Sequence, residues 1–226
     1  MIDKILRDMA EAMAGIRDGS TVLLGGFGSV GQPDDLIEGL IEQGATDLTV
    51  VANNAGTGRT GLARLMELGR VRKIICSYPR SAGSVVFEEL YRAGRLDLEI
   101  VPQGTLAERI RAAGAGIPAF FTPTAAGTRL GQGKEVREFQ GRPHVLETAL
   151  HADVALVEAW QADRWGNLTY RGSGRNFNPV MASAATLTIA QAQHVVPLGG
   201  IAPDAVITPG VFVDRVIQVA RSAPWA

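Results

Sequence analysis

Cysteine and lysine are both scarce in this sequence. Its 226 residues include one cysteine, Cys76, and three lysines. A single thiol excludes an internal disulfide framework and any zinc or iron–sulfur site built from several cysteines, and it is typical of a protein in a reducing cytoplasm. We expect Cys76 to be a small core residue. Since no GxxxxGK[ST] pattern surrounds any lysine, the sequence contains no P-loop for a nucleoside triphosphate.

An excess of charge of either sign is also missing. The 22 Lys and Arg residues balance 23 Asp and Glu residues, which gives a formal net charge of −1. This balance disfavours a nucleic-acid partner or an anionic membrane surface, because both select a basic face. No stretch approaches the roughly 18 continuous apolar residues that a membrane-spanning helix needs. We therefore expect a cytoplasmic protein with no membrane and no nucleic acid among its partners.

Glycine and proline, in contrast, are abundant: 27 glycines and 11 prolines are spread between short apolar runs. These runs predict buried strands, because they are continuous and rich in Val, Ile and Leu. The predicted strands are Thr21–Leu24, Leu48–Ala52, Val71–Ser77 and Leu96–Val101. The predicted helices between them are Asp34–Gln43, Ser84–Ala93 and Thr105–Ala113, the last with a capping box of Thr105 and Glu108. The alternation predicts an α/β fold, with an open, mostly parallel sheet and helices on both faces.

The two ends of the chain fit the same single domain, residues 1–226. Apolar residues between Ile2 and Ile16 recur at helical spacing, which predicts a packing helix rather than a signal peptide. After a predicted loop at Ala115–Leu130, the segments 135–139 and 144–148 flank a turn at Gln140–Pro143 and predict an inserted β-hairpin. The remaining predicted elements are strands at Ala152–Trp160 and Asn167–Arg171, a helix at Asn178–Ala185, and a closing element of undecided type at Ile207–Val219.

The clearest chemical signal is the glycine-rich turn Gly25–Gly31, which lies between a predicted strand and a predicted helix. Its backbone N–H groups and the helix amino terminus can face a phosphate or an oxyanion. Gly26, Gly28 and Gly31 also fit GxGxxG, but Asp47, the acid about twenty positions on, precedes its strand instead of ending it. A purely structural tight turn and a nicotinamide dinucleotide site remain as alternatives.

Five segments in the same order resemble one known family. They are DGSTVLLGGFGSVGQP at 18–33, VANNAG at 51–56, PQGTLAERIRAAGAGIPAFFTPTAAGT at 102–128, GKEVREFQGR at 133–142 and GNLTYRGSGRNFNP at 166–179. The chain is similar to the A (alpha) subunit of family I coenzyme A transferases over nearly its whole length. The resemblance implies that family's three-layer fold and a CoA site, facing a partner subunit, to which the glycine turn contributes. The residues of the turn that the resemblance implies for CoA binding are Gly25, Gly26, Phe27, Gly28, Ser29, Val30 and Gly31.

The resemblance also implies that the nucleophile is absent from this chain. In this family it is a glutamate in a Ser-Glu-Asn-Gly-like motif on the B subunit, and no Glu-Asn-Gly occurs here. Glu158 is expected to be an ordinary strand-end residue. Because CoA transfer exchanges one thioester for another, we expect no metal and no permanently bound cofactor, with CoA and acyl-CoA as substrates. The expected partner is a B subunit, in a heterodimer or a dimer of heterodimers.

Polar side chains at predicted strand ends are candidates for substrate binding. Asn53 and Asn54 follow the second strand and Gln103 follows the fourth, although such residues also satisfy turn backbones. Arg80, in the loop SYPRSAG at 77–83, could hold a second carboxylate, or it could be a surface arginine. That loop resembles family members that transfer CoA from succinyl-CoA to 3-oxoadipate in aromatic degradation. Acetoacetate or another short acid is the near alternative, and a non-catalytic CoA-ester-binding module is the alternative of a different class.

The aromatic and imidazole side chains give no catalytic pattern. His144, His151 and His194 lack metal-ligand spacing and an adjacent carboxylate or thiol motif, so structural roles are expected. Trp160 and Trp165 flank a turn and pack either that turn or a subunit interface; the sequence does not decide between the two.

Overall fold

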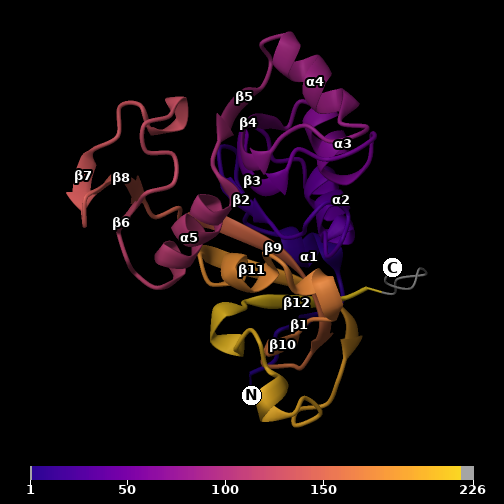
Figure 1. The fold of residues 1–226 in the computed structure, drawn as a ribbon. Helices are drawn as coiled ribbons and strands as arrows, with labels where there is room; N and C mark the ends of the chain where they lie inside the picture. Colours follow the sequence, from indigo (N-terminus) through magenta and orange to yellow (C-terminus); the bar gives the residue numbers. More distant parts are fainter. Residues whose placement is uncertain (1, 220–226) are drawn as a thin grey trace.

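The computed structural model describes residues 2–219, which form a large sheet covered by helices and a small projecting sheet (Figure 1). The large sheet has the order β1-β12-β11-β9-β2-β3-β4-β5, with β10 paired antiparallel to β9 and every other pairing parallel. Its strands are β1 Ile5–Leu6, β2 Thr21–Leu24, β3 Leu48–Asn54, β4 Val71–Tyr78, β5 Asp97–Ile100, β9 Ala152–Ala162, β10 Leu168–Thr169, β11 Ala185–Val195 and β12 Arg215–Gln218. The predicted open, mostly parallel α/β sheet is thus confirmed.

Helices cover both faces of this sheet, and successive strand residues point to opposite faces. In β2, Leu23 packs in the cluster that holds α5 (Gln103–Gly114) and α6 (Asn178–Ala182). Its neighbours Val22 and Leu24 pack on the other face. The helices there are α1 Met9–Met13, α2 Asp34–Gln43, α3 Gly61–Glu67 and α4 Val85–Arg92. Burial on both faces explains why these strands have continuous apolar sequences.

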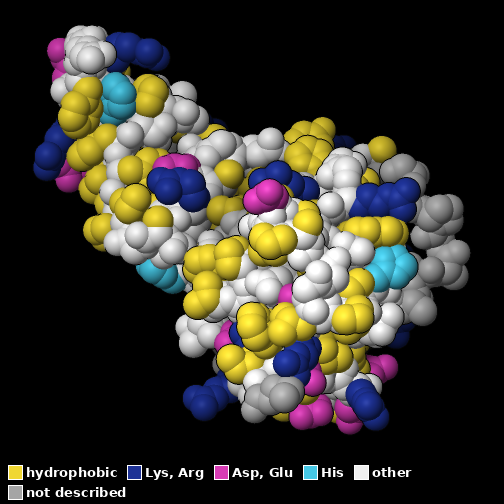
Figure 2. All heavy atoms as spheres, turned by 90° about the horizontal axis from the view of Figure 1, so that it is seen from below, with side chains coloured by type: hydrophobic (Ala, Val, Ile, Leu, Met, Phe, Trp, Pro, Cys, Tyr) yellow, Lys and Arg dark blue, Asp and Glu magenta, His cyan; other side chains and the backbone are white. Residues whose placement is uncertain are grey.

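The small sheet forms a lobe that projects from the body, on the left in Figure 1. Its antiparallel order is β6-β8-β7, with β6 at Ala119–Thr122, β7 at Val136–Phe139 and β8 at Arg142–Thr148. The predicted hairpin is therefore present, but its turn is shorter, because Arg142 and Pro143 already pair with β7. Figure 2, seen from below, shows the lobe with hydrophobic, basic and acidic side chains on its surface.

The predicted loop at Ala115–Leu130 is wrong over its middle, where β6 pairs with β8 as the third strand of the lobe. The amino-terminal helix is also wrong in extent. Ile5 and Leu6 pair with β12 as β1, and only Met9–Met13 are helical, so the apolar spacing reflects two elements that bury side chains separately. The capping box is not formed, since α5 begins at Gln103 and the buried Thr105 hydroxyl has no hydrogen-bond partner in the described residues.

Three further elements differ from the predictions. Helix α3 and the eleven-residue strand β11 were not predicted, and α6 ends at Ala182 where β11 soon begins. The closing element of undecided type is strand β12, preceded by a short turn of 3₁₀ helix at Gly210–Phe212. Trp160 is half-buried, edge-on against His194 and under the Arg171 guanidinium of the same chain, and Trp165 is 45% exposed. No helix in the part of the chain that the structure describes is long and apolar enough to span a membrane.

Candidate functional site

A hollow of about 450 Å³ lies at the carboxyl ends of four neighbouring strands, β2, β3, β4 and β5. Parallel strands bring their carboxyl ends to one edge of the sheet, where α/β proteins bind ligands. Each strand and the loop after it contribute lining residues: Phe27 and Gly28 after β2, Asn53 and Asn54 from β3, Ser77, Tyr78 and Ser81 from β4 and its loop, and Gln103 after β5. The volume suits a small organic ligand or part of a larger one.

The predicted residues Asn53, Asn54 and Gln103 do meet at this hollow. The Gln103 amide donates a 2.7 Å hydrogen bond from Nε2 to Asn53 Oδ1. The Asn53 side chain is buried, and its Nδ2 donates to no acceptor among residues 2–219, so this group is available to a ligand. Asn54 has a local role as well, because its Oδ1 accepts from the Gly56 N–H at 2.9 Å and shapes the loop.

Sequence reasoning missed the residues at the end of β4. Ser77 lines the hollow with a buried hydroxyl that has no hydrogen-bond partner in the described chain. Tyr78 is 61% exposed and Phe27 is 51% exposed, both on the lining. The sequence did contain a signal for Ser77, because it is the last residue of a predicted strand. Asn53 was selected on the same ground, since it directly follows a predicted strand. Large aromatic groups left this exposed at a cavity are typical of a surface that a ligand or partner covers.

Arg80 does not line the hollow, although its neighbour Ser81 does. Its guanidinium Nε lies 2.7 Å from Glu88 Oε1 on α4, and the Arg80 side chain is 72% exposed. Glu88 also pairs with Arg92, one turn further along the helix, at 2.8 Å. Glu88 would therefore keep a cationic partner if Arg80 turned away from it.

The glycine turn is a tight reversal in which Phe27 and Val30 exchange both backbone hydrogen bonds, at 3.0 and 3.2 Å. Gly26, Gly28 and Gly31 have φ values of +116°, +63° and +66°, which favour glycine. At the tip, the N–H groups of Gly28 and Ser29 have no acceptor among the described residues. Gly28 lines the hollow, and a free backbone donor at a cavity is suited to an oxyanion or a carboxylate.

The amino terminus of α2 is less suited to an anion than the tip of the turn. Asp34 and Asp35 place negative charge in its first turn, and the Leu36 N–H already donates to Gln191 Oε1 at 3.1 Å. A second hollow, of about 460 Å³, lies beyond Gly28 and Asn54 and includes Asp34 and Glu38 in its lining. The turn therefore separates this acidic hollow from the first hollow, in which no described lining residue is charged, so an anionic ligand is favoured in the first hollow.

The described residues offer no carboxylate or thiolate in the hollow that could act as a nucleophile. Cys76 is in the core, as expected, where burial raises the pKa of its thiol to about 12. Glu158 is not the expected strand-end residue: it lies within β9 opposite Gln191 and is 1% exposed. No group of three or more His, Cys, Asp or Glu side chains that could hold a metal ion occurs between residues 2 and 219.

Comparisons with known proteins place the chain in one family. The family model for coenzyme A transferase matches residues 6–219. The A subunit of the 3-oxoadipate CoA-transferase of Pseudomonas putida is 58% identical over 223 residues, which are 99% of this chain and 96% of that protein. The A subunit of the succinyl-CoA:3-ketoacid coenzyme A transferase of Xanthomonas campestris is 51% identical over 211 residues, 93% of this chain and 86% of that protein.

The fold is shared with the crystal structure of glutaconate coenzyme A-transferase from Acidaminococcus fermentans. The TM-score is 0.84 at 24% identity, with 96% of this chain and 76% of that chain covered. The family match over nearly the whole described chain, and two relatives above 50% identity, decide the assignment. The chain belongs to the coenzyme A transferase family, as an A subunit.

Proposed function

We propose that this chain is the A subunit of a cytoplasmic transferase that moves CoA from succinyl-CoA to 3-oxoadipate in aromatic degradation. The observation that carries the proposal is the 58% identity to the A subunit of a 3-oxoadipate CoA-transferase over 99% of the chain. The proposed partner is a B subunit that closes the hollow and supplies the nucleophile. Exposed Phe27 and Tyr78 at the hollow support a covering partner.

The proposed chemistry stores the acyl group covalently on a glutamate of the B subunit. The glutamate carboxylate attacks the succinyl thioester carbonyl; a C–O bond forms, the C–S bond breaks and CoA thiolate leaves. The thiolate then attacks the glutamyl carbonyl of this anhydride, which gives a glutamyl-CoA thioester and releases succinate. The acceptor acid repeats both steps in reverse and regenerates the carboxylate. No electron is transferred, so the cycle requires no redox cofactor. One thioester is exchanged for another, so it requires no nucleoside triphosphate to activate the acid.

In this proposal the hollow of the A subunit stabilises charge rather than reacting. Every step passes through a tetrahedral oxyanion, and the free N–H group of Gly28, on the lining of the hollow, can donate to it without reorganising. The amides of Asn53, Asn54 and Gln103 can orient the carboxylate and the 3-oxo group of the acid. Residues 25–31, which the family resemblance implies for the CoA site, contribute backbone N–H groups rather than side chains in this proposal.

We expect the isolated chain to transfer no CoA and to form no covalent CoA adduct. Coexpressed with its B subunit, it should transfer CoA from succinyl-CoA to 3-oxoadipate. Borohydride trapping and mass spectrometry should then find the modified glutamate on the B subunit. Modification of a residue on this chain would overturn the mechanism, and binding of acyl-CoA by an inactive complex would favour the non-catalytic binding module.

Acetoacetate is the second candidate acceptor, because none of the described residues that line the hollow carries a positive charge to hold a second carboxylate. Arg80 can supply one only by leaving Glu88. If Arg80 does bind the second carboxylate, Arg80→Ala should lower kcat/KM for 3-oxoadipate about ten- to a hundredfold, because one charge-assisted hydrogen bond is lost. The value of kcat/KM for acetoacetate should change far less. Succinyl-CoA also carries a distal carboxylate, so the step that uses it would respond to the same change. Discharge of the enzyme–CoA intermediate to each acid is therefore measured separately from the reaction with succinyl-CoA.

Arg92→Ala is the matched control, since Arg92 pairs with the same Glu88 carboxylate from the next turn of α4. It should leave both acceptors unaffected. Equal losses for 3-oxoadipate and acetoacetate in Arg80→Ala would make Arg80 a surface charge and favour the monocarboxylate acceptor.

A further inference from the structure

Two asparagines far along the chain hold the backbone of the glycine turn. Asn176 Oδ1 accepts the Gly26 N–H at 3.1 Å, although the two residues are 150 positions apart. Asn176 Nδ2 donates to the Val30 carbonyl at 3.0 Å and to the Ser173 carbonyl at 2.9 Å. One amide group thereby connects both arms of the turn, as a neighbouring strand would in a sheet.

Asn178 fixes the base of the same turn to the large sheet. It is fully buried. Its Nδ2 donates to the carbonyls of Gly31 and Gly174, both at 2.9 Å, and its Oδ1 accepts the Glu158 N–H of β9 at 2.9 Å. Since β9 is the neighbour of β2, the asparagine joins the exit of the turn to the strand beside its entrance.

Two glycines of the turn are explained by these contacts. A Cβ on Gly25 would lie 1.8 Å from Asn178 Oδ1, and a Cβ on Gly31 would lie 2.8 Å from Asn176 Nδ2. Both approaches are too close for any side chain. Gly28, at the tip, has open space around its position. The base of the turn is therefore tightly packed on the asparagines, while its tip is free to meet a ligand.

We propose that Asn176 and Asn178 are positioning residues for the glycine turn, and that they hold the N–H group of Gly28 at the hollow. The inference rests on the proposed function, in which that donor meets the oxyanion. An amide suits this role because it donates and accepts at once, so one side chain satisfies an N–H on one arm and a carbonyl on the other. Donors held before the reaction cost no reorganisation when charge develops.

The test uses Asn176, which is only half-buried, because a change at the fully buried Asn178 risks the fold. Asn176→Ala removes its bonds to Gly26 and Val30. In the reconstituted complex we expect kcat to fall about tenfold or more, with KM for succinyl-CoA within about twofold of wild type. Asn176→Asp keeps the acceptor for Gly26 but loses the donor to Val30, and should be intermediate in kcat.

Asn167→Ala is the matched control. The Asn167 amide also joins two backbone segments, accepting the Gly210 N–H at 2.9 Å and donating to Asp163 at 2.8 Å, but it lies outside the lining of the hollow. It should lower thermal stability and leave kcat unchanged. Equal kcat losses in Asn167→Ala and Asn176→Ala, or an unchanged kcat in Asn176→Ala, would overturn the positioning role.

Hydrogen exchange separates this inference from the proposed function. In the full chain, the Phe27 and Val30 amides should exchange faster in Asn176→Ala than in wild type or Asn167→Ala. Unchanged exchange at these amides overturns the proposal. If the wild-type complex transfers no CoA while exchange rises as expected, the proposed function fails and the hold of Asn176 on the turn is upheld.

Discussion

Replacing Gly25 with alanine is expected to lower the free energy of unfolding by about 3 kcal/mol or more. The new methyl group would lie 1.8 Å from Asn178 Oδ1 and 2.7 Å from its Cγ, so the buried asparagine must move. Overpacking alone costs about 1–3 kcal/mol, and each buried polar group left without its bond costs about 1–3 more. The Glu158 N–H and the Gly31 carbonyl both lose their partner if Asn178 moves. Urea unfolding followed by circular dichroism measures the loss.

Gly28→Ala is the matched control for this steric effect. Open space surrounds a Cβ at that position, and the remaining cost is the left-handed φ of +63°, about 1–2 kcal/mol for alanine. The variant should fold and copurify with the B subunit, but its methyl group at the tip should reduce CoA transfer. A loss of stability in Gly28→Ala as large as that in Gly25→Ala would mean that the tip, like the base, is structural.

The first half of the fold was predictable because its strands are buried on both faces. Thr21–Leu24 was predicted with the observed bounds, and Asp34–Gln43 ends at Gly44, whose φ is +97°. Strand β11 was not predictable in the same way, because Thr, Gln and His interrupt its apolar residues. Gln191 is completely buried there only because its Oε1 accepts the Leu36 N–H of α2, a contact between residues 155 positions apart. Long-range hydrogen bonds of this kind leave no local pattern.

The site likewise contains residues that local sequence predicts and residues that only long-range contacts explain. Asn53, Asn54 and Gln103 could be placed because parallel strands bring their ends together. The different roles of the glycines could not be predicted, since Gly25 is required by the Asn178 side chain, and Gly31 by the Gly174 carbonyl and the Asn176 side chain, all about 150 residues away. Arg80 shows a different limit: its position after a strand was predictable, but its pairing with Glu88 depends on how the loop folds back on α4.

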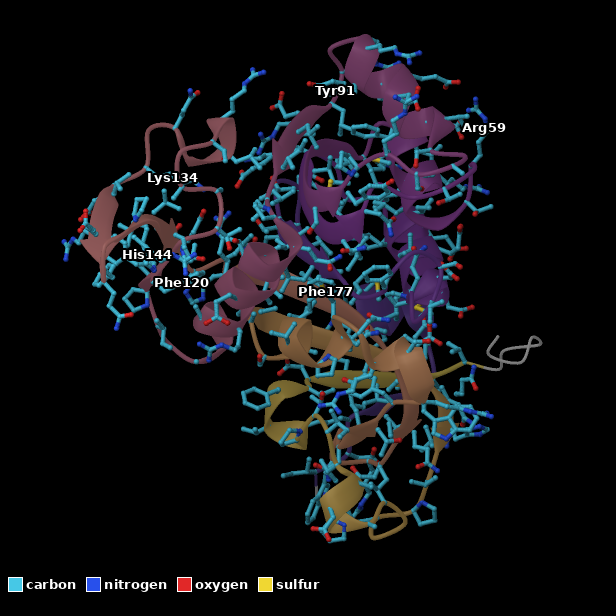
Figure 3. The ribbon with its side chains drawn as sticks, viewed as in Figure 1. Arg59, Tyr91, Phe120, Lys134, His144 and Phe177 are labelled. Carbon is cyan, nitrogen blue, oxygen red and sulfur yellow. The ribbon has the colours of Figure 1, made fainter. Side chains whose placement is uncertain are left out.

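The projecting lobe should depend on one ion pair, between Lys134 and Glu147 (Figure 3 labels Lys134). Lys134 Nζ lies 2.5 Å from Glu147 Oε1, and the Glu147 side chain is 3% exposed. Lys134→Met leaves this carboxylate buried without its cation; because the Lys134 side chain is 31% exposed and solvent screens the pair in part, the cost falls below the roughly 3–5 kcal/mol of a fully buried pair. A sheet of three short strands has little apolar area with which to offset such a loss. We expect the amides of β6, β7 and β8 to exchange faster in the variant, before the large sheet unfolds.

Two further variants identify burial of the charge as the cause. Lys134→Met combined with Glu147→Leu removes both charges and should regain most of the stability, because a buried pair replaced by apolar groups costs little. Glu135→Gln breaks the Glu135–Arg137 pair of the same lobe, whose side chains are 47% and 62% exposed. That change should alter stability by less than about 1 kcal/mol. If Glu135→Gln were as damaging as Lys134→Met, charge in general rather than the buried Glu147 carboxylate would hold the lobe together.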